Sequence, residues 1–142
     1  MKDSIKKLFA EYEKAFNALD VEKQVPFFAQ HFISAGPKGS IALGRDEFAK
    51  MAGKAAEFYR SVGQTSAKIL SMEETEISNE YSMIKVHWGV TFEKTGNKLI
   101  EFDVTYFIQK TSHTISQKSY IIESIIILLM GESDENESCS TF

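Results

Sequence analysis

Residues 81–110 read YSMIKVHWGVTFEKTGNKLIEFDVTYFIQK, and apolar and polar side chains alternate along most of this stretch. Tyr81–Glu93 and Lys98–Lys110 each show the two-residue period of a β-strand. Between them, residues 94–97 (KTGN) are typical of a hairpin turn. The stretch therefore predicts two long antiparallel strands joined by a tight turn.

The alternation gives the predicted hairpin one apolar face. That face carries the single tryptophan of the chain, and its members are Ile84, Val86, Trp88, Val90, Phe92, Ile100, Phe102, Val104, Tyr106 and Ile108. The opposite face carries polar groups, among them His87, Glu101 and Asp103. Because an apolar sheet face must be covered by other elements of the chain, we expect helices to pack on it.

Three helical patterns lie on the N-terminal side of the hairpin. In the first, apolar residues recur with helical spacing at Ile5, Leu8, Phe9, Tyr12, Phe16 and Leu19. Asp20 is a suitable N-cap for a second, shorter helix that we expect to extend through Phe28 to about His31. The third opens at Gly44–Glu47 and ends at Gly63.

Further strands are predicted over residues 65–78 and 117–130, so helices come first and a run of strands follows. This order predicts an α+β fold with three N-terminal helices packed on one face of a strongly curved antiparallel sheet. We expect residues 1–130 to form a single domain and residues 131–142 to form an acidic, serine-rich tail.

Composition and charge argue against several classes of function. The chain has 142 residues and a formal charge of −4, which disfavours binding to nucleic acid or to an anionic membrane. Its one cysteine, Cys139, cannot form an internal disulfide. His31, His87 and His113 lack the spacing of a metal site, so we expect no metal and no cofactor.

His87 is expected on the outer sheet face and His113 in a loop. No apolar export signal is visible, so the expected location is cytoplasmic.

The predicted last strand, residues 117–130, is apolar on both of its faces. Tyr120, Ile122, Ser124, Ile126, Leu128 and Met130 alternate with Ile121, Ile125, Ile127 and Leu129. Since helices can cover only one face, we expect a second copy of the chain to cover the other, in a two-fold homodimer joined through the outer sheet face. The alternative is that the C-terminal tail folds back over that face.

Several short segments, in a fixed order, carry a family resemblance. They are EYEKAFNALD at residues 11–20, GRDEF at 44–48, VTFE at 90–93, Gly96, and VTY at 104–106. Together they resemble the nuclear transport factor 2-like superfamily, which includes SnoaL-like cyclases and ketosteroid isomerases. The resemblance covers residues 5–130, and it implies a cystatin-like cone whose sheet and helices enclose an apolar pocket.

The resemblance also implies roles for particular positions. Tyr12 matches the tyrosine that donates a hydrogen bond to a developing enolate oxygen in the ketosteroid isomerases. The general-base aspartate of that family falls on Gly36 here, and its second acid falls on Val104. Since neither residue can exchange a proton, catalysis would depend on Tyr12, with Tyr59 or Tyr106 as the orienting hydroxyl.

The implied pocket would take a small apolar or aromatic ligand. Its expected lining is Phe16, Phe28, Phe58, Tyr59, Trp88, Val90, Phe92, Val104, Tyr106 and Ile108. The same side chains could instead fill the cone as a packed core.

Two functions therefore stay open. One is a small-molecule-binding protein of the SnoaL-like isomerase, lyase or cyclase type without the usual general base. The other is a non-catalytic protein-interaction or dimerisation module of the nuclear transport factor 2 type.

Overall fold

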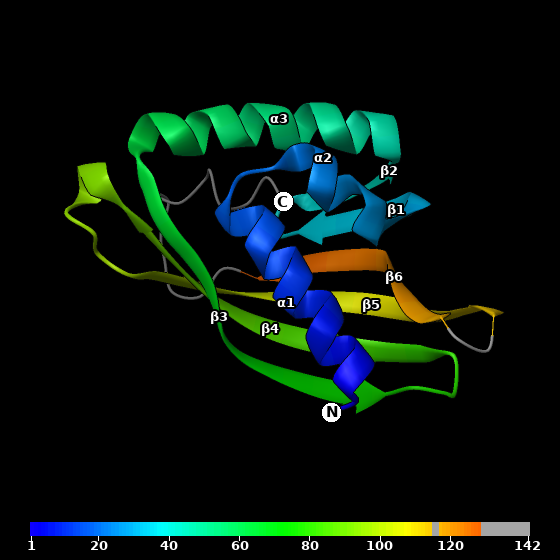
Figure 1. The fold of residues 1–142 in the computed structure, drawn as a ribbon. Helices are drawn as coiled ribbons and strands as arrows, with labels where there is room; N and C mark the ends of the chain where they lie inside the picture. The colour runs from blue at the N-terminus through cyan, green and yellow to red at the C-terminus, as the bar shows by residue number, and fades with distance from the viewer. Residues whose placement is uncertain (115–116, 129–142) are drawn as a thin grey trace.

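The computed structural model describes residues 1–114 and 117–128, and the side chains of residues 1–110 and 122. Helices and strands of this part of the chain are drawn in Figure 1. In chain order they are α1 (Asp3–Asn17), α2 (Val21–Gln24), the 3₁₀ helix η1 (Val25–Phe27), β1 (Phe28–Gly36), β2 (Gly39–Gly44), α3 (Arg45–Val62), β3 (Gln64–Glu76), β4 (Tyr81–Phe92), the 3₁₀ helix η2 (Glu93–Thr95), β5 (Ile100–Thr114) and β6 (Gln117–Leu128).

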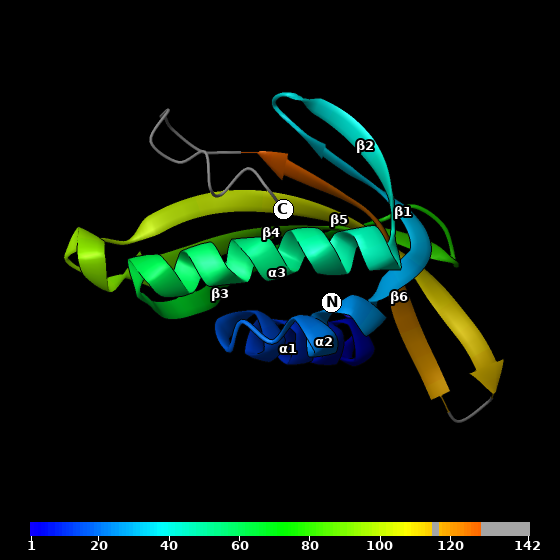
Figure 2. The ribbon, with the colours of Figure 1, turned by 90° about the horizontal axis from the view of Figure 1, so that it is seen from above.

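The strands form one six-stranded sheet in the order β2-β1-β6-β5-β4-β3. Neighbouring strands are antiparallel except β1 and β6, which run parallel. Helices α1, α2 and α3 all lie on one side of the sheet, and the long strands curve beside them (Figures 1 and 2). The predicted α+β fold, with three helices on a curved sheet, is confirmed.

Helix α1 is fixed to the edge strand β3 by two of its polar side chains. Its apolar stripe, from Ile5 to Phe16, is buried against the sheet as its spacing predicts. On the flank of the helix, the Asn17 side-chain oxygen accepts a hydrogen bond from the Ala67 N–H at 2.8 Å. The Glu13 carboxylate accepts another from the Ile69 N–H at 2.5 Å. The free backbone donors of the β3 edge are thereby satisfied at these two residues.

The predicted second helix is wrong in its extent. It starts as expected, since the Asp20 carboxylate accepts a hydrogen bond from the Lys23 N–H at 3.2 Å. It ends at Gln24, and after one 3₁₀ turn the chain enters β1. Pro26 has no N–H to donate, and it sits in that turn, where a helix can stop without losing a bond.

Two strands, β1 and β2, therefore stand where no strand is predicted, and the expected order of helices followed by strands is wrong. Phe28 and His31 belong to β1 instead of a helix. The break at residues 36–39 is a hairpin turn, since Gly36 pairs with Gly39. Phe28 and Phe32 are both buried. Residues four positions apart lie on the same face of a helix. Residues an even number of positions apart also lie on the same face of a strand, so this spacing fits both structures.

The central hairpin agrees with its prediction. Val86 of β4 pairs with Val104 of β5, and the residues predicted to face inward are buried, with Trp88 only 1% exposed. The turn contains two left-handed residues, Gly96 at φ 72° and Asn97 at φ 58°. Glycine and asparagine are the residues that tolerate this conformation best, which is why KTGN predicts a turn here.

The simple alternation expected for the last strand fails at one point. Ile108 pairs with Ile122, whereas the neighbouring Phe107 pairs with Ser124, so the register shifts by one residue between them. Ile122 is fully buried. It therefore lies on the inner face, and the strict two-residue pattern that grouped it with Ser124 is wrong there. His113 lies within β5 instead of a loop.

Helix α3 starts and ends where the sequence predicts. The Glu47 carboxylate accepts a hydrogen bond from the Gly44 N–H at 3.1 Å, as in a capping box. Gly63 ends the helix in the left-handed conformation, with φ 80°.

The prediction is wrong for one pocket residue on this helix. Phe58 is 48% exposed, whereas its neighbour Tyr59 is 3% exposed and faces the sheet. At helical spacing these adjacent positions cannot both point inward.

Candidate functional site

Tyr12 lies at the centre of a cluster of aromatic rings between α1 and the sheet. It is 3% exposed, and its ring centroid lies 5.6 Å from that of Phe27, 5.9 Å from that of Phe28 and 6.1 Å from that of Trp88. Each of these pairs meets edge to face, the arrangement that ring quadrupoles favour. The position that carries the family resemblance to a catalytic tyrosine is therefore inside the cone.

A chain of hydrogen bonds crosses this aromatic cluster. Trp88 Nε1 donates to the Tyr106 hydroxyl at 3.2 Å. The Tyr106 and Tyr12 hydroxyls are hydrogen-bonded to each other, a contact that lowers the pKa of Tyr12 and raises that of Tyr106. Tyr106 therefore joins the indole N–H of Trp88 to the hydroxyl of Tyr12 inside the cluster.

Burial controls the charge state of both tyrosines. It raises the pKa of Tyr12 and that of Tyr106 well above the ordinary tyrosine value, because a phenolate would lose its hydration inside the ring cluster. Besides burial, Tyr106 is the only described group that shifts the pKa of Tyr12. Both tyrosines therefore stay neutral near neutral pH and can act as hydrogen-bond donors, and no described carboxylate acts on Tyr12.

The residues expected to line a pocket are brought together, with the exception of Phe58. The buried ones are Phe16, Phe28, Tyr59, Trp88, Val90, Phe92, Val104, Tyr106 and Ile108. Phe28 reaches this interior from strand β1, not from a helix. The Phe16 and Trp88 ring centroids are 5.0 Å apart, and those of Phe28 and Phe48 are 4.5 Å apart. In the described part of the interior, the wall residues thus contact one another closely.

Neither position that the resemblance matches to an acid carries a carboxylate. Gly36 ends β1 and leaves no carboxylate at the position of a general base. Val104 is buried on the inner face, and Asp103 lies on the opposite face with its partner His87. The described interior therefore offers hydrogen-bond donors and apolar surface, and it offers no base of the ketosteroid isomerase kind.

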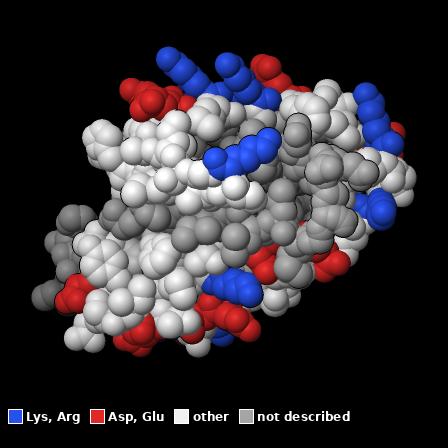
Figure 3. Space-filling view, turned by 180° about the vertical axis from the view of Figure 1, so that it is seen from behind, with Lys and Arg blue, Asp and Glu red and all other residues white. Residues whose placement is uncertain are grey.

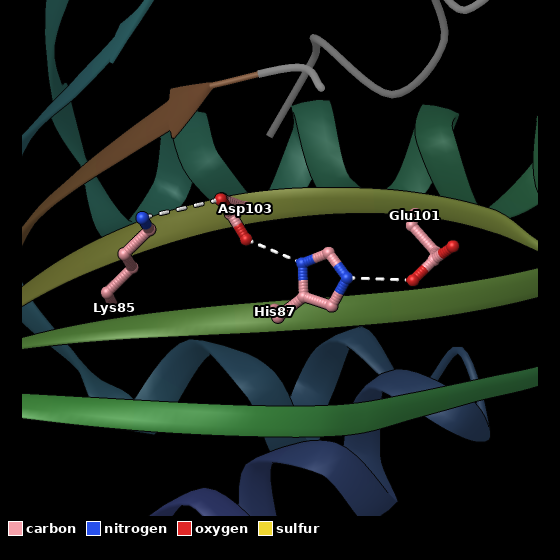
Figure 4. A network of polar contacts seen from close by, with 4 residues as sticks. All are labelled: Lys85, His87, Glu101 and Asp103. Carbon is pink, nitrogen blue, oxygen red and sulfur yellow. Dashed lines mark hydrogen bonds and ion pairs between the residues drawn. The ribbon is translucent and has the colours of Figure 1, made fainter. Parts of the chain in front are cut away.

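A second polar site lies on the outer face of the sheet, away from the helices (Figure 4). His87 Nδ1 lies 2.6 Å from an Asp103 carboxylate oxygen, and His87 Nε2 lies 2.8 Å from a Glu101 carboxylate oxygen. Lys85 Nζ is 3.7 Å from the other Asp103 oxygen. The group borders a shallow hollow of about 200 Å³, lined by Ser71, Glu73, Lys85, His87 and Asp103.

The two carboxylates favour the charged form of the imidazole. Hydrogen bonds to Glu101 and then to Asp103 raise the pKa of His87, and the partial burial of the ring opposes them more weakly. The sequence places all three residues on the outer face, but it does not show that they meet. A signal was available: pairing the strands outward from the KTGN turn sets His87 opposite Asp103 and beside Glu101.

Comparison with known proteins places this geometry in a family. Residues 2–116 match the family described as NTF2-like protein (DUF6841). The chain belongs to this NTF2-like family. It shares the NTF2-like fold with proteins described as ketosteroid isomerase-like. No curated protein sequence matches it.

Solved structures show the same NTF2-like fold at low sequence identity. An NTF2-like protein of unknown function from Shewanella oneidensis is 19% identical, with a TM-score of 0.71 over 89% of this chain and 97% of that one. A cystatin-like protein of unknown function from Nostoc punctiforme is 14% identical, with a TM-score of 0.72 over 93% and 92%. A ketosteroid isomerase-like protein from Erwinia carotovora atroseptica is 14% identical, with a TM-score of 0.62 over 91% and 95%. The NTF2-like fold expected from the sequence is therefore confirmed.

Within the described residues, no helix is both long and apolar enough to cross a membrane.

Proposed function

We propose that this NTF2-like chain binds a small apolar or aromatic molecule inside its cone, with the Tyr12 hydroxyl as the polar contact. The observation that carries the proposal is the buried hydroxyl of Tyr12 inside the ring cluster, joined through Tyr106 to Trp88. Buried donors in folded proteins are almost always satisfied by protein, water or ligand. A donor surrounded by rings suits a flat molecule that carries one oxygen acceptor.

The same group defines the chemistry that the interior can support. A neutral, buried phenol that is hydrogen-bonded to a second phenol can stabilise negative charge developing on a ligand oxygen. The described interior supplies no carboxylate to remove a proton from carbon. We therefore propose binding as the primary activity, and isomerase, lyase or cyclase chemistry only for a substrate that supplies its own base.

Titration with 2-naphthol, a flat ring system with one hydroxyl, tests this function. Trp88 is the only tryptophan, so its fluorescence reports on the interior directly. We expect saturable quenching and a rise in melting temperature. The Tyr12→Phe variant keeps the ring and removes the donor. It should bind 2-naphthol about tenfold more weakly, the equivalent of one hydrogen bond.

Naphthalene is the matched control, because it lacks the oxygen and should bind the wild-type chain and the variant alike. If neither compound gives a saturable change in the wild-type chain, the interior is a packed core and the binding function is wrong. If 2-naphthol binds both proteins equally, a pocket exists but Tyr12 is not its polar contact.

A dimerisation module is the second candidate, and one observation favours it. Leu70 and Leu99 are 46% and 49% exposed, and both pack over Gly89 on the outer sheet face. A methyl group at Gly89 would lie only 2.9 Å from the nearer Leu70 carbon. Charged side chains of both signs lie among uncharged ones on the described part of this side of the molecule (Figure 3). We propose that a second copy of the chain covers this face.

A further inference from the structure

The imidazole of His87 is held between two acceptors. Asp103 faces Nδ1 at 2.6 Å and Glu101 faces Nε2 at 2.8 Å (Figure 4). A neutral imidazole has one N–H and one lone pair, so it can donate to only one carboxylate and must turn its lone pair toward the other. Only the imidazolium ion satisfies both contacts. The geometry of the cluster is therefore that of the protonated histidine.

The surroundings of His87 on every adjoining strand are balanced in charge only when it carries this proton. Lys85 lies two residues away on β4, and Glu101 and Asp103 lie across on β5. On β3, Ser71 lies opposite His87, with Lys68 opposite Gly89 and Glu73 opposite Lys85. The β6 residues in register with Thr105 and Asp103 are Ile126 and Leu128, which carry no charge. The named group holds three positive and three negative charges with His87 protonated, and an excess of one negative charge without it.

We propose that the outer face self-associates in a proton-dependent manner, with His87 between Asp103 and Glu101 as the group that admits or excludes a second copy. This rests on the homodimer proposed above. Packing a copy on this face removes water from the cluster, which is tolerable for balanced, hydrogen-bonded charges and costly for an unpaired one. The Asp103 side chain is already only 11% exposed, so it has little water to replace a lost imidazolium.

The direction of the effect follows from the raised pKa of folded His87. Association is strongest where the imidazole is protonated, below the ordinary histidine value, and it weakens as the pH rises through the raised value. A two-fold dimer contains two such clusters, so loss of both protons leaves two excess negative charges in one interface. The protonation of both His87 side chains therefore affects the same monomer–dimer equilibrium.

Sedimentation of the full chain between about pH 6 and about pH 9 tests the proposal, because this range spans the titration of an imidazole with raised pKa. We expect the dimer dissociation constant to rise by about tenfold or more across the range. The His87→Gln variant should show no such rise. The matched control His31→Gln changes a histidine on β1, outside the cluster, and should keep the wild-type dependence.

Glu101→Gln provides a second variant that leaves the fold intact, since the Glu101 side chain is 48% exposed. Removing this negative charge lowers the pKa of His87, so the midpoint of the dissociation should move to lower pH. The imidazole proton signals of His87, followed by NMR, should move in the same direction.

Three outcomes would overturn the proposal. A wild-type dimer with a dissociation constant independent of pH leaves the homodimer standing and removes the role of His87. A pH dependence that persists in His87→Gln assigns the effect to another group. A wild-type chain that is monomeric at every pH removes the homodimer and, with it, the proton dependence.

Discussion

Tyr106 is the residue on which the interior polar contacts depend. Its oxygen accepts from Trp88 and its hydroxyl is hydrogen-bonded to that of Tyr12, so a single side chain satisfies a buried indole N–H and contacts a second phenol. Tyr12 has Tyr106 as its hydrogen-bond partner. The two tyrosines, whose rings contact each other, therefore differ in what their hydroxyls support.

Replacing each tyrosine with phenylalanine separates these roles. Tyr106→Phe leaves the Trp88 N–H buried without an acceptor, which should lower the free energy of unfolding by about 1–3 kcal/mol. Tyr12→Phe, the matched control, should lower it less, by about 1 kcal/mol, since it removes one hydrogen bond whereas Tyr106→Phe removes two. Urea unfolding followed by Trp88 emission measures both. Equal losses in the two variants would contradict the double role of Tyr106.

The inward orientation of Tyr12, Trp88 and Tyr106 could be predicted from residue periodicity alone. Their contacts could not, because the Trp88–Tyr106 bond joins positions that are not directly opposite: Trp88 pairs with Phe102, and Tyr106 pairs with Ile84. Such diagonal contacts depend on the twist of the sheet, which the sequence does not specify.

At the scale of elements, the strong predictions are those with a unique local signal. Helix α3 has a capping glutamate and a terminal glycine, and the β4–β5 hairpin has a turn that demands left-handed residues. Strands β1 and β2 lack such signals. Strand β1 is held by its pairing with β6, some ninety residues later in the chain, and the residues of β1 alone fit a helix equally well.

Two glycines of α3 give a matched pair of predictions. Gly63 has φ 80°, and an added Cβ would lie 3.0 Å from the Cβ of Glu93. Gly63→Ala should therefore lower the free energy of unfolding by about 1–2 kcal/mol. Gly53 lies inside the helix with open space around it, so Gly53→Ala should raise stability by about 0.5–1 kcal/mol. Thermal unfolding of both variants checks the opposite signs; a stabilised Gly63→Ala would show that the helix does not end there in a left-handed turn.

At the scale of the whole molecule, the helices cover one face of the sheet (Figures 1 and 2), and we propose that a second copy covers the other. The exposed leucines over Gly89 and the His87 cluster lie on that second face. A stable dimer buries about 1,200–2,000 Å² in total, and the proposed interface on this face would have to reach that area. The outer face is therefore where the assembly of this protein should be decided.

Sedimentation at micromolar concentration checks that assembly. We expect a dimer of the 16.0 kDa chain, and we expect the double variant Leu70→Ser, Leu99→Ser to be monomeric because it removes the exposed apolar surface. Ile77→Ser, at an equally exposed position beyond the end of β3, should leave the dimer intact. A shortened chain that ends at Met130 tests whether the C-terminal tail, instead of a second copy, covers this face. If the tail covers it, the full chain is monomeric and the shortened chain associates.

The attachment of α1 to β3 also bears on how this protein would aggregate. Glu13 and Asn17 occupy the outward N–H groups of Ile69 and Ala67. Farther along the same strand, Glu73, Glu74 and Glu76 supply negative charge that repels a similar strand. A partial unfolding that releases the first helix thus uncovers the core and, in the same event, creates a template to which another polypeptide can add laterally. Keeping this helix attached therefore protects the edge of the sheet as well as the core.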